Sequence, residues 1–446
     1  MIKRIFALIL AVFISFSLFA GENKLKTRSL ENGIPVFIFP NDSNRIDFIS
    51  ISVKGGVFYL DETQSGLENT MFSLMALESE NYSLEDIENW HYKTNATISG
   101  AAGSLNASLS LSCIDYYLED SLPILLDCFI NPKFSKNQWD IAMNNHKQEL
   151  QSKMNDPASM MFYFADQMIY QNHPFNVKAS PTAFSLEQFT PEALEYLHKK
   201  DMNASRICVI AVTNFDETKL LAILNSTLGT LSSDEESLKE TSVPALTELP
   251  AEPLELEHPS AGTSGHIARV VLAEPVTGDD YMAFTLATSI YDQIMYSVIR
   301  TKHGACYSPY TMSYGNQANV AFEMIYRCSD FENIMDYMAE ARQIMAEGKI
   351  ISGTKDDGSF IFEEMADKLE SYKNTLINST YSSQATTRGR AGRIISSIYL
   401  FDDPYAMDNL IKKIRAVQSE DILRVFKKYF LDSPEFWISV KGTQEN

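Results

Sequence analysis

A polar, proline-containing seam divides this chain of 446 residues into two halves of similar length. The seam runs from about Ser226 to Ser264 and joins an acidic, serine-rich run to a stretch between Pro244 and Pro259. Segments of that composition bury little apolar surface and favour extended backbone. We therefore expect two units, at residues 21–228 and 263–446, joined by a linker at 229–262.

Hydrophobic patterning predicts the same order of elements on both sides of the seam. In the first half we expect strands at 36–39, 48–53, 96–112 and 206–212, and helices at 66–80, 116–129 and 136–154. In the second half we expect strands at 266–272, 307–327 and 436–440, and helices at 281–300, 331–346 and 359–376. A repeated order indicates duplication. The fold class is therefore predicted to be α+β, with two homologous α/β halves, each a mainly antiparallel sheet covered by helices.

The charge balance restricts the partners. The chain carries 37 Lys and Arg against 58 Asp and Glu, a net charge of −21. Such a chain is repelled by phosphates unless a local basic stripe compensates, and the sequence contains no such stripe, so no nucleic-acid partner is expected. The 45% of apolar residues suffices for more than one packed core.

The first residues have the pattern of a secretory signal peptide. Two basic residues precede an apolar run at 5–19, which ends at the small pair Ala20-Gly21. We predict a signal peptide at 1–20 and an exported protein, periplasmic in a bacterium and secreted otherwise. The alternative is an uncleaved anchor. Nothing later in the chain is apolar for long enough to cross a bilayer, so no stable membrane span is expected after cleavage.

The cysteines and histidines form no metal-binding pattern. Five cysteines are an odd number without a close pair, which excludes a zinc knuckle and a disulfide framework but leaves one or two disulfides open. No two histidines are three or four residues apart, so no helix presents two imidazoles on one face. Ligand spacing alone therefore indicates no class of enzyme.

Two segments resemble a known family. Residues 30–36, Leu-Glu-Asn-Gly-Ile-Pro-Val, followed by 49–53 and 66–73, resemble the opening of the insulinase/pitrilysin-type zinc metallopeptidases, which include the mitochondrial processing peptidase. The run from Arg300 to Tyr307 is similar to the R-x-x-x-G-x-x-Y segment of that family's second half. The resemblance extends over residues 28–442 and implies two halves that form a clamshell.

The resemblance is interrupted at the family's inverted zinc motif, H-x-x-E-H. The corresponding positions hold Asn69, Phe72 and Ser73. Asn and Ser are weak zinc ligands, and Phe cannot accept a proton from a bound water. Glu149 lies near the family's distal glutamate ligand, but one carboxylate does not make a zinc site. We therefore expect no metal, no cofactor and no catalytic residue in this chain alone.

The helix that carries these positions has the pattern of a packing helix. An apolar stripe at helical spacing consists of Leu67, Met71, Leu74 and Met75. Such a stripe is suited to packing on a sheet. Phe72 lies beside the stripe, where it could fill the space of the metal.

Arg300 and Tyr307 are the strongest positive signal. In the family that the chain resembles, an Arg and a Tyr of the second half bind the substrate backbone and the oxyanion, across the clamshell from the zinc. In some bacterial members one chain carries the zinc motif and its partner carries this pair. The resemblance thus implies a non-catalytic subunit of a heterodimeric peptidase, with zinc in a partner of the same family and a peptide as substrate. The alternative is a helix-end ion pair for Arg300 and a half-buried strand position for Tyr307.

A further segment resembles the edge strand along which the family holds an extended peptide. It consists of Asn95, Ala96, Thr97, Ile98 and Ser99. Peptide bound along such a strand is held by main-chain hydrogen bonds and needs no metal, although an ordinary sheet strand explains the segment equally well. The second hypothesis for the whole chain is therefore a catalytically dead peptide-binding or scaffold protein of the same fold.

Overall fold

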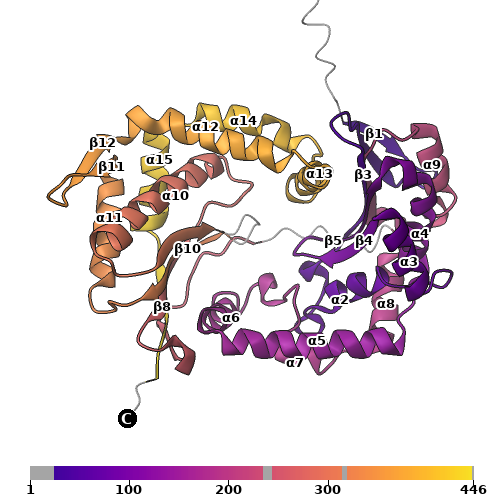
Figure 1. The fold of residues 1–446 in the computed structure, drawn as a ribbon, viewed down its shortest axis with the longest axis horizontal. Helices are drawn as coiled ribbons and strands as arrows, with labels where there is room; N and C mark the ends of the chain where they lie inside the picture. The colour runs from indigo at the N-terminus through magenta and orange to yellow at the C-terminus, as the bar shows by residue number, and fades with distance from the viewer. Residues whose placement is uncertain (1–24, 235–243, 314–318, 444–446) are drawn as a thin grey trace, which may run out of the picture.

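The computed structural model describes residues 25–234, 244–313 and 319–443. These residues form two large sheets and the helices that cover them (Figure 1). The signal peptide predicted at residues 1–20 lies outside the described residues. In the part of the chain that is described, no helix is both long and apolar enough to cross a membrane.

The first half is built on a mainly antiparallel sheet. Its strands lie in the spatial order β1 (Lys26–Ser29), β2 (Pro35–Phe39), β6 (Ile207–Val212), β3 (Ile46–Lys54), β5 (Asn106–Ile114) and β4 (Thr97–Ala102). The helices are α2 (Leu67–Met75), α3 (Leu84–Thr94), α4 (Leu118–Ile130), α5 (Lys136–Asn155), α6 (Pro157–Ile169), α7 (Ala183–Leu186), α8 (Pro191–Asp201) and α9 (Glu217–Asn225). Apolar residues of β3 and β5 meet those of α2 and α4 in one core, so this face of the sheet is covered from within the half.

The second half repeats this plan. Its sheet has the order β7 (Leu254–Glu257), β13 (Glu435–Lys441), β8 (Gly265–Leu272), β10 (Val320–Cys328) and β9 (Ser308–Ser313), and a separate hairpin pairs β11 (Lys349–Thr354) with β12 (Phe360–Glu364). The helices are α10 (Tyr281–Met295), α11 (Ile334–Ala346), α12 (Met365–Ser383), α13 (Thr387–Phe401), α14 (Leu410–Ala416) and α15 (Ser419–Phe426). A π-helix, η9 (Tyr296–Lys302), continues α10.

Strand pairing confirms the predicted duplication. In each sheet one parallel pair, β2 with β6 or β7 with β13, precedes a run of antiparallel pairs. The run is β6–β3–β5–β4 in the first sheet and β13–β8–β10–β9 in the second. Only β1, which extends the first sheet, has no counterpart among the described strands of the second. The chain therefore has two homologous α+β halves.

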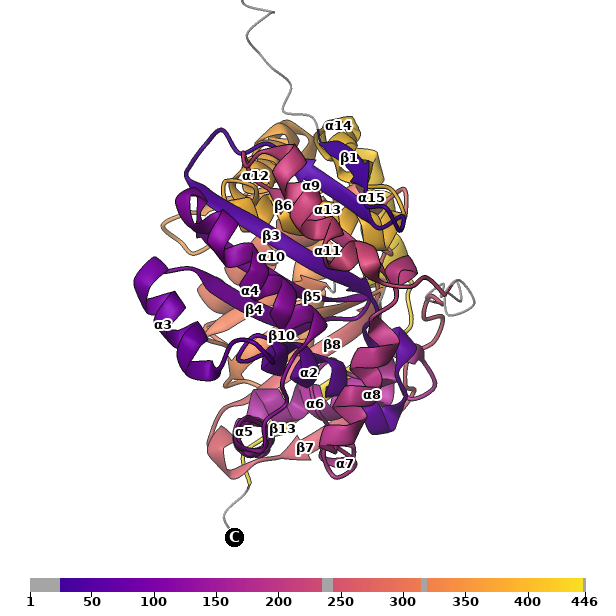
Figure 2. The ribbon, with the colours of Figure 1, turned by 90° about the vertical axis from the view of Figure 1, so that its right-hand side faces the viewer.

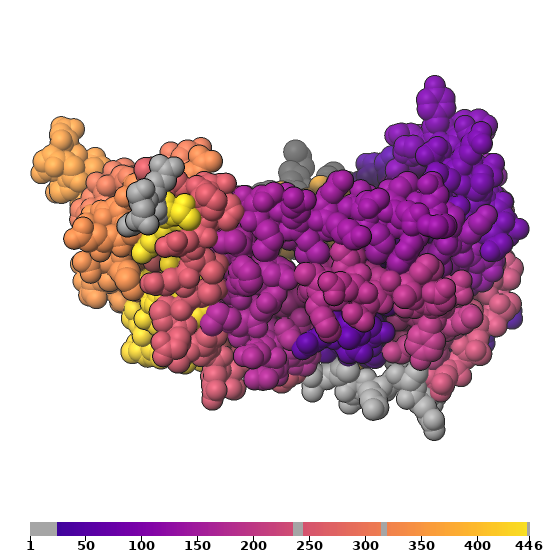
Figure 3. All heavy atoms as spheres, turned by 90° about the horizontal axis from the view of Figure 1, so that it is seen from below, coloured from indigo at the N-terminus to yellow at the C-terminus, as the bar shows by residue number. Residues whose placement is uncertain are grey.

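Each half also covers a sheet of the other. The helix α6 of the first half packs on the second sheet, where the ring of Phe162 meets that of Phe322 at 5.4 Å between centroids. In the reverse direction α13 places Ala391 and Ile394 on the outer face of the first sheet. Figures 1 and 2 show α13 beside β3 and β6, and Figure 3 shows residues of the first half reaching the second on the lower surface. The exchange of α6 and α13 joins the two halves through two apolar cores.

The helix predicted at 66–80 ends at Met75, and several helices, among them α6 and α13, were not predicted. Three further differences concern the linker and the strands. The helix predicted at 359–376 begins instead as β12, because residues 360–364 pair with β11, and α12 starts only at Met365. The linker predicted at 229–262 contains β7, which pairs in parallel with β13. Asn95 and Ala96 precede the edge strand, since Asn95 ends α3 with a left-handed φ of 53° and β4 starts at Thr97.

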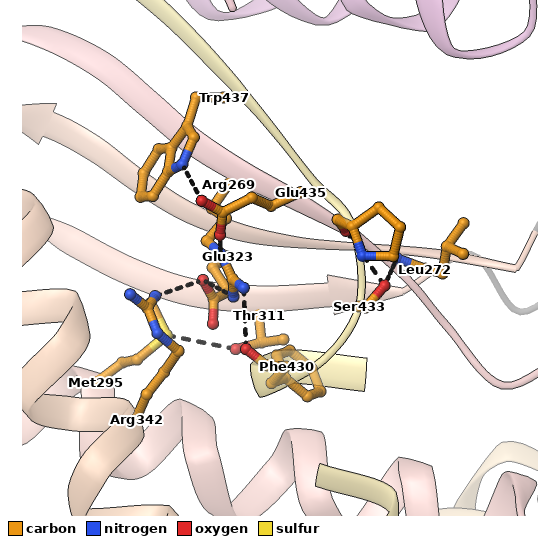
Figure 4. A network of polar contacts seen from close by, with 11 residues as sticks. Arg269, Leu272, Met295, Thr311, Glu323, Arg342, Phe430, Ser433, Glu435 and Trp437 are labelled. Atoms are coloured by element: carbon orange, nitrogen blue, oxygen red, sulfur yellow. Dashed lines mark hydrogen bonds and ion pairs between the residues drawn. The ribbon is translucent and has the colours of Figure 1, made fainter. Parts of the chain in front are cut away.

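A buried ionic network crosses the second sheet (Figure 4). The Glu323 carboxylate on β10 accepts hydrogen bonds from the guanidinium groups of Arg269 and Arg342, each at 3.1 Å. Arg269 also pairs with Glu435 on β13 and donates to the carbonyl of Phe430 at 2.9 Å. The network therefore links β8, β10 and β13 to α11 and to the π-helix η11 (Lys427–Leu431).

Candidate functional site

The helix α2 carries the positions of the zinc motif, and the structure uses them for packing. The Asn69 side-chain oxygen accepts a hydrogen bond from the backbone N–H of Ala102 at 2.9 Å, at the end of β4. The Ser73 hydroxyl is exposed and donates to the Asn69 carbonyl one turn earlier, at 2.8 Å. Both side chains are thus committed to backbone groups of their own half.

Phe72 is part of the core. Its side chain is fully buried, and its ring lies 6.5 Å from that of Phe129 on α4. The helix also approaches β4 closely at this point, because a Cβ added to Gly100 would lie 1.8 Å from the Phe72 carbonyl oxygen. The predicted stripe of Leu67, Met71, Leu74 and Met75 is buried as well. The helix is therefore fixed against both the sheet and α4.

Glu149 lies on α5 as a surface charge. Its carboxylate forms an i,i+4 ion pair with Lys153 at 2.8 Å, and its side chain is 51% exposed. One turn earlier on the same helix, the His146 Nε2 lies 2.9 Å from the Thr70 hydroxyl of α2. Burial lowers the pKa of His146, so this imidazole is neutral at pH 7 and is used to join α5 to α2.

The donor set at this place does not fit a zinc ion. Zinc binds imidazole, thiolate or carboxylate groups arranged around one point. Here the potential ligands are an amide, a hydroxyl and a paired carboxylate, and the buried Phe72 stands at the position of the proton acceptor. Among the described residues, no group of three or more His, Cys, Asp or Glu side chains is placed to hold a metal.

A second feature of α2 is not visible in the sequence. Glu68 is buried beside the ion pair of Asp201 and Arg206, whose charged atoms lie 2.8 Å apart with almost no exposure. One Glu68 carboxyl oxygen accepts from the backbone N–H of Gly56 at 2.7 Å. Burial, together with the Asp201 charge, raises the pKa of Glu68 to about 8, and burial raises the pKa of Asp201 to about 6. The pKa of Glu68 therefore lies above neutral pH, and its carboxyl group is protonated at pH 7.

This cluster makes stability depend on pH. A glutamate in the unfolded chain releases its proton near pH 4.5, whereas folded Glu68 retains it up to about pH 8. Between these values the folded state binds more protons, so the free energy of unfolding falls as the pH rises. We expect Glu68→Gln, which keeps the acceptor for Gly56 and a donor toward Asp201, to raise the free energy of unfolding at pH 8 by about 2 kcal/mol. Urea unfolding of both proteins at pH 5.5 and pH 8 measures the effect.

The exposed Glu88 on α3 provides the matched control. Glu88→Gln makes the same chemical change on the surface. The free energy of unfolding should then differ between pH 5.5 and pH 8 by the same amount as in the unaltered protein. If Glu68→Gln is no more stable than the unaltered protein at pH 8, the carboxyl is not protonated in the folded state.

Arg300 and Tyr307 are brought together at the end of η9. A π-helix is rare and often marks a functional site, and this one carries Arg300 in its last turn. The Arg300 guanidinium donates to the Tyr307 carbonyl and lies 5.0 Å from the centroid of its ring. The Tyr307 side chain is exposed, and its hydroxyl has no hydrogen-bond partner among the described residues. The donors of the guanidinium that do not bind this carbonyl, and the phenol, are thus available to a ligand.

The edge strand β4 pairs with β5 on one side and with no other described strand. Its Ser99 hydroxyl accepts a hydrogen bond from Arg388 of α13 at 3.4 Å. The second half therefore reaches the strand that the sequence predicts as a peptide-binding edge. The five cysteines are buried and free, so the structure contains none of the disulfides that the sequence left open.

Solved structures share this architecture at low identity. A protease from Helicobacter pylori superposes with a TM-score of 0.79 at 13% identity, over 94% of this chain and 99% of that one. A peptidase M16 inactive domain from Pseudomonas fluorescens gives 0.79 at 15% identity, over 94% and 98% of the two chains. The periplasmic protease PqqL from Escherichia coli gives 0.74 at 17% identity, with 95% of this chain matching 46% of that one. At such identities the likeness establishes the fold.

A family model supplies the sequence evidence. Residues 188–347 match the model described as the peptidase M16 inactive domain. This part of the chain is similar to the M16 inactive domain. The matched region runs from α8 to α11 and includes Arg300 and Tyr307, but it lies outside α2. The search of curated proteins gives no match. The description 'inactive domain' applies to residues 188–347, which do not contain the zinc-motif positions of α2.

Proposed function

We propose that this chain is the non-catalytic subunit of a two-chain zinc peptidase. Its partner is a zinc-bearing chain of the same family, and this chain contributes Arg300 and Tyr307 to the binding of a peptide substrate. The observation that carries the proposal is the contrast between two places in the structure. The zinc-motif positions are occupied by groups used for packing, whereas the Arg and Tyr lie together with free donors.

The chemistry of the pair suits an acyl-transfer site. The guanidinium is a fixed fork of donors that can bind the carbonyl oxygens of an extended peptide. The phenol adds one directed donor where negative charge develops during attack on the peptide bond. The zinc in the partner supplies the activated water. This chain therefore provides orientation and charge stabilisation, and export to the periplasm or outside the cell is part of the same proposal.

The test combines the purified chain with its zinc-bearing partner. We expect no peptide hydrolysis by this chain alone and recovery of hydrolysis in the mixture. Arg300→Ala and Tyr307→Phe should each lower kcat/KM of the complex about 100-fold, the usual cost of losing one oxyanion donor. Sedimentation velocity should show unchanged assembly, because neither change removes a buried residue.

Arg45→Ala is a suitable control, since Arg45 is an exposed arginine just before β3 whose side chain pairs with Asp115. It should leave turnover unaltered. Full activity in both the Arg300 and Tyr307 variants would remove the proposed role, and chelator-sensitive hydrolysis by the chain alone would refute a non-catalytic subunit.

The strand β4 pairs with only one other described strand, which supports one alternative, a peptide-binding or scaffold protein that needs no partner enzyme. Calorimetry with the isolated chain distinguishes the two functions. A scaffold binds peptide but activates no zinc-bearing chain of the family.

A further inference from the structure

Tyr307 lies close to two arginines, only one of which belongs to the family motif. Arg300 lies 5.0 Å from the centroid of the Tyr307 ring, and Arg327 of β10 lies 5.8 Å from the same centroid. Both the Tyr307 and Arg327 side chains are exposed. Two guanidinium groups on one exposed ring concentrate positive charge in a protein of net charge −21.

The backbone holds Arg327 in an unusual conformation. Its φ is +51°, in the left-handed region that costs a residue with a side chain about 1–2 kcal/mol. The conformation occurs where the register of β10 shifts between Ile325 and Cys328, and the Arg327 N–H donates to the His266 Nδ1 at 3.3 Å. The bulge therefore turns this side chain out of the strand at the position beside Tyr307. A strained backbone conformation at an exposed residue such as Arg327 is typical of a functional position.

Neither guanidinium has a carboxylate partner among the described residues. Of the ten other described arginines, seven form an ion pair, and Arg388, Arg390 and Arg415 form none among the described residues. Ion pairs with Asp or Glu are formed by Arg28, Arg45, Arg206, Arg269, Arg342, Arg393 and Arg424. Both guanidinium groups lie near the Tyr307 ring, and neither charge is balanced by an ion pair among the described residues. Each can therefore attract an anion from another molecule.

A hollow beside Arg327 offers room for such a ligand. Its volume is about 750 Å³, within the range of small-molecule sites. The second half contributes Tyr326, Arg327 and His266 to its wall, and the start of α6 in the first half contributes Asp156 and Ser159. Asp156 is the acid in this wall, and its carboxylate accepts from the Ser159 N–H at 2.7 Å as the cap of α6. The hollow thus lies between the halves, with Arg327 at its border with Tyr307.

We propose that Arg300, Tyr307 and Arg327 form a binding site for a peptide carboxylate, so that the substrates of this subunit are acidic at or near the bound segment. The inference deepens the proposed function and rests on it, because only a peptidase subunit has a substrate. Binding of a carboxylate, in contrast, needs only this chain. Arg327 is a specificity residue in this account. Its planar fork matches a carboxylate in two-point contact, and lysine would bind the same group only as a point charge. An acidic side chain and a free C-terminal carboxylate offer the same chemistry.

The test measures binding of labelled peptides to the isolated full chain by fluorescence anisotropy. One peptide carries Glu residues, a matched peptide carries Gln in their place, and each is made with a free and with an amidated C-terminus. We expect the acidic peptide to bind at least about tenfold more tightly than its Gln counterpart, with a preference that falls as salt increases. Loss of the preference on Glu to Gln substitution assigns the anion to side chains, and loss on amidation assigns it to the C-terminus.

Variants of Arg327 separate a specific site from general charge. Arg327→Ala should abolish the tenfold preference, Arg327→Lys should keep part of it, and Arg45→Ala should keep all of it, because Arg45 is exposed but paired with Asp115. Thermal unfolding of each variant checks that the fold is intact.

Two results would overturn the inference: equal affinity for the acidic and neutral peptides in the unaltered chain, or an Arg327→Ala variant with the full preference. Either result leaves the proposed subunit role standing if the complex still requires Arg300 and Tyr307. Conversely, a chain that prefers acidic peptides but activates no partner retains the carboxylate site and loses the peptidase role.

Discussion

A variant in which the zinc motif is restored, Asn69→His with Phe72→Glu and Ser73→His, is expected to be less stable than the natural chain and to bind no stoichiometric zinc. The largest cost comes from Phe72. Truncation of a buried Phe costs about 3–5 kcal/mol, and a glutamate at the same place adds an unpaired buried carboxyl. We expect the triple variant to lose at least about 4 kcal/mol of its free energy of unfolding.

The surroundings of α2 explain why the helix does not adapt. The close contact between Gly100 and the Phe72 carbonyl leaves no space for the helix to move toward β4. An imidazole at position 69 would also release the backbone N–H of Ala102 from its acceptor. Glu149, the remaining carboxylate, is paired with Lys153. Two of the three changes would thus be made at positions, Asn69 and Phe72, that already hold packing contacts.

The measurement is the zinc content after dialysis, together with urea unfolding. The double variant Asn69→His and Ser73→His, which keeps Phe72, is the control and should lose only about 1 kcal/mol, mainly from the bond to Ala102. A triple variant as stable as the natural chain, with one zinc per molecule, would show that α2 is still a metal site.

The pattern of α2 illustrates what sequence reasoning can reach. Its stripe was predictable because residues four and three apart lie on one face. The burial of Phe72 beside the stripe was not, because it depends on α4, whose Phe129 is 57 positions away in the chain and meets it only in the folded core. The loss of the zinc ligands could be recognised from the sequence. Only the structure shows that packing contacts have replaced them.

Local composition explains the misplaced elements. The proline-containing seam suggested a linker, although its Leu-Glu-Leu-Glu run at 254–257 alternates with period two, the signal of a half-buried strand. In the same way Asp356, Asp357 and Gly358 are typical turn residues and precede the strand region at 360–364. The prediction of a helix at 359–376 did not take them into account. Both signals were present, and both are short compared with the helices beside them.

Non-local features could not be inferred. The exchange of α6 and α13 depends on the packing of whole halves, and Glu68 meets Asp201 and Arg206 across more than half of the first unit. No sequence motif marks Arg327, because its position beside Tyr307 results from a bulge in β10 and a left-handed φ. The pair of Arg300 and Tyr307 could be proposed early because one segment of eight residues contains both.

Glu323→Ala is expected to be the most damaging single change in the second half. Its carboxylate is fully buried and joins two guanidinium groups (Figure 4). Removal leaves Arg342 without this partner and Arg269 with Glu435 alone. Breaking a buried ion pair by removal of one partner costs about 3–5 kcal/mol, because a charge remains without compensation in the interior. Chemical unfolding should show a loss of this size, a large share of the stability of a typical domain.

A double variant tests whether the cost comes from the uncompensated charge. Glu323→Met combined with Arg342→Met removes one acid and one base together and should lose less than Glu323→Ala alone, as found where buried pairs are replaced by apolar groups. The surface pair of Lys427 and Asp432 is the control: Asp432→Ala should change stability by less than about 0.5 kcal/mol. If the double variant costs as much as the sum of its single changes, the network is not a coupled unit.

Glu323→Ala also shows whether Glu323 only stabilises the strands around the proposed carboxylate site or takes part in binding. Glu323 lies four residues before Arg327 on β10, which pairs with β9 directly after Tyr307. Its removal weakens this platform but takes no donor from the proposed carboxylate site. Acidic-peptide affinity of Glu323→Ala should therefore equal that of the natural chain at low temperature, where the variant is folded, and should fall on warming together with the folded fraction. Loss of affinity in the fully folded variant would instead place Glu323 in the charge balance of the site.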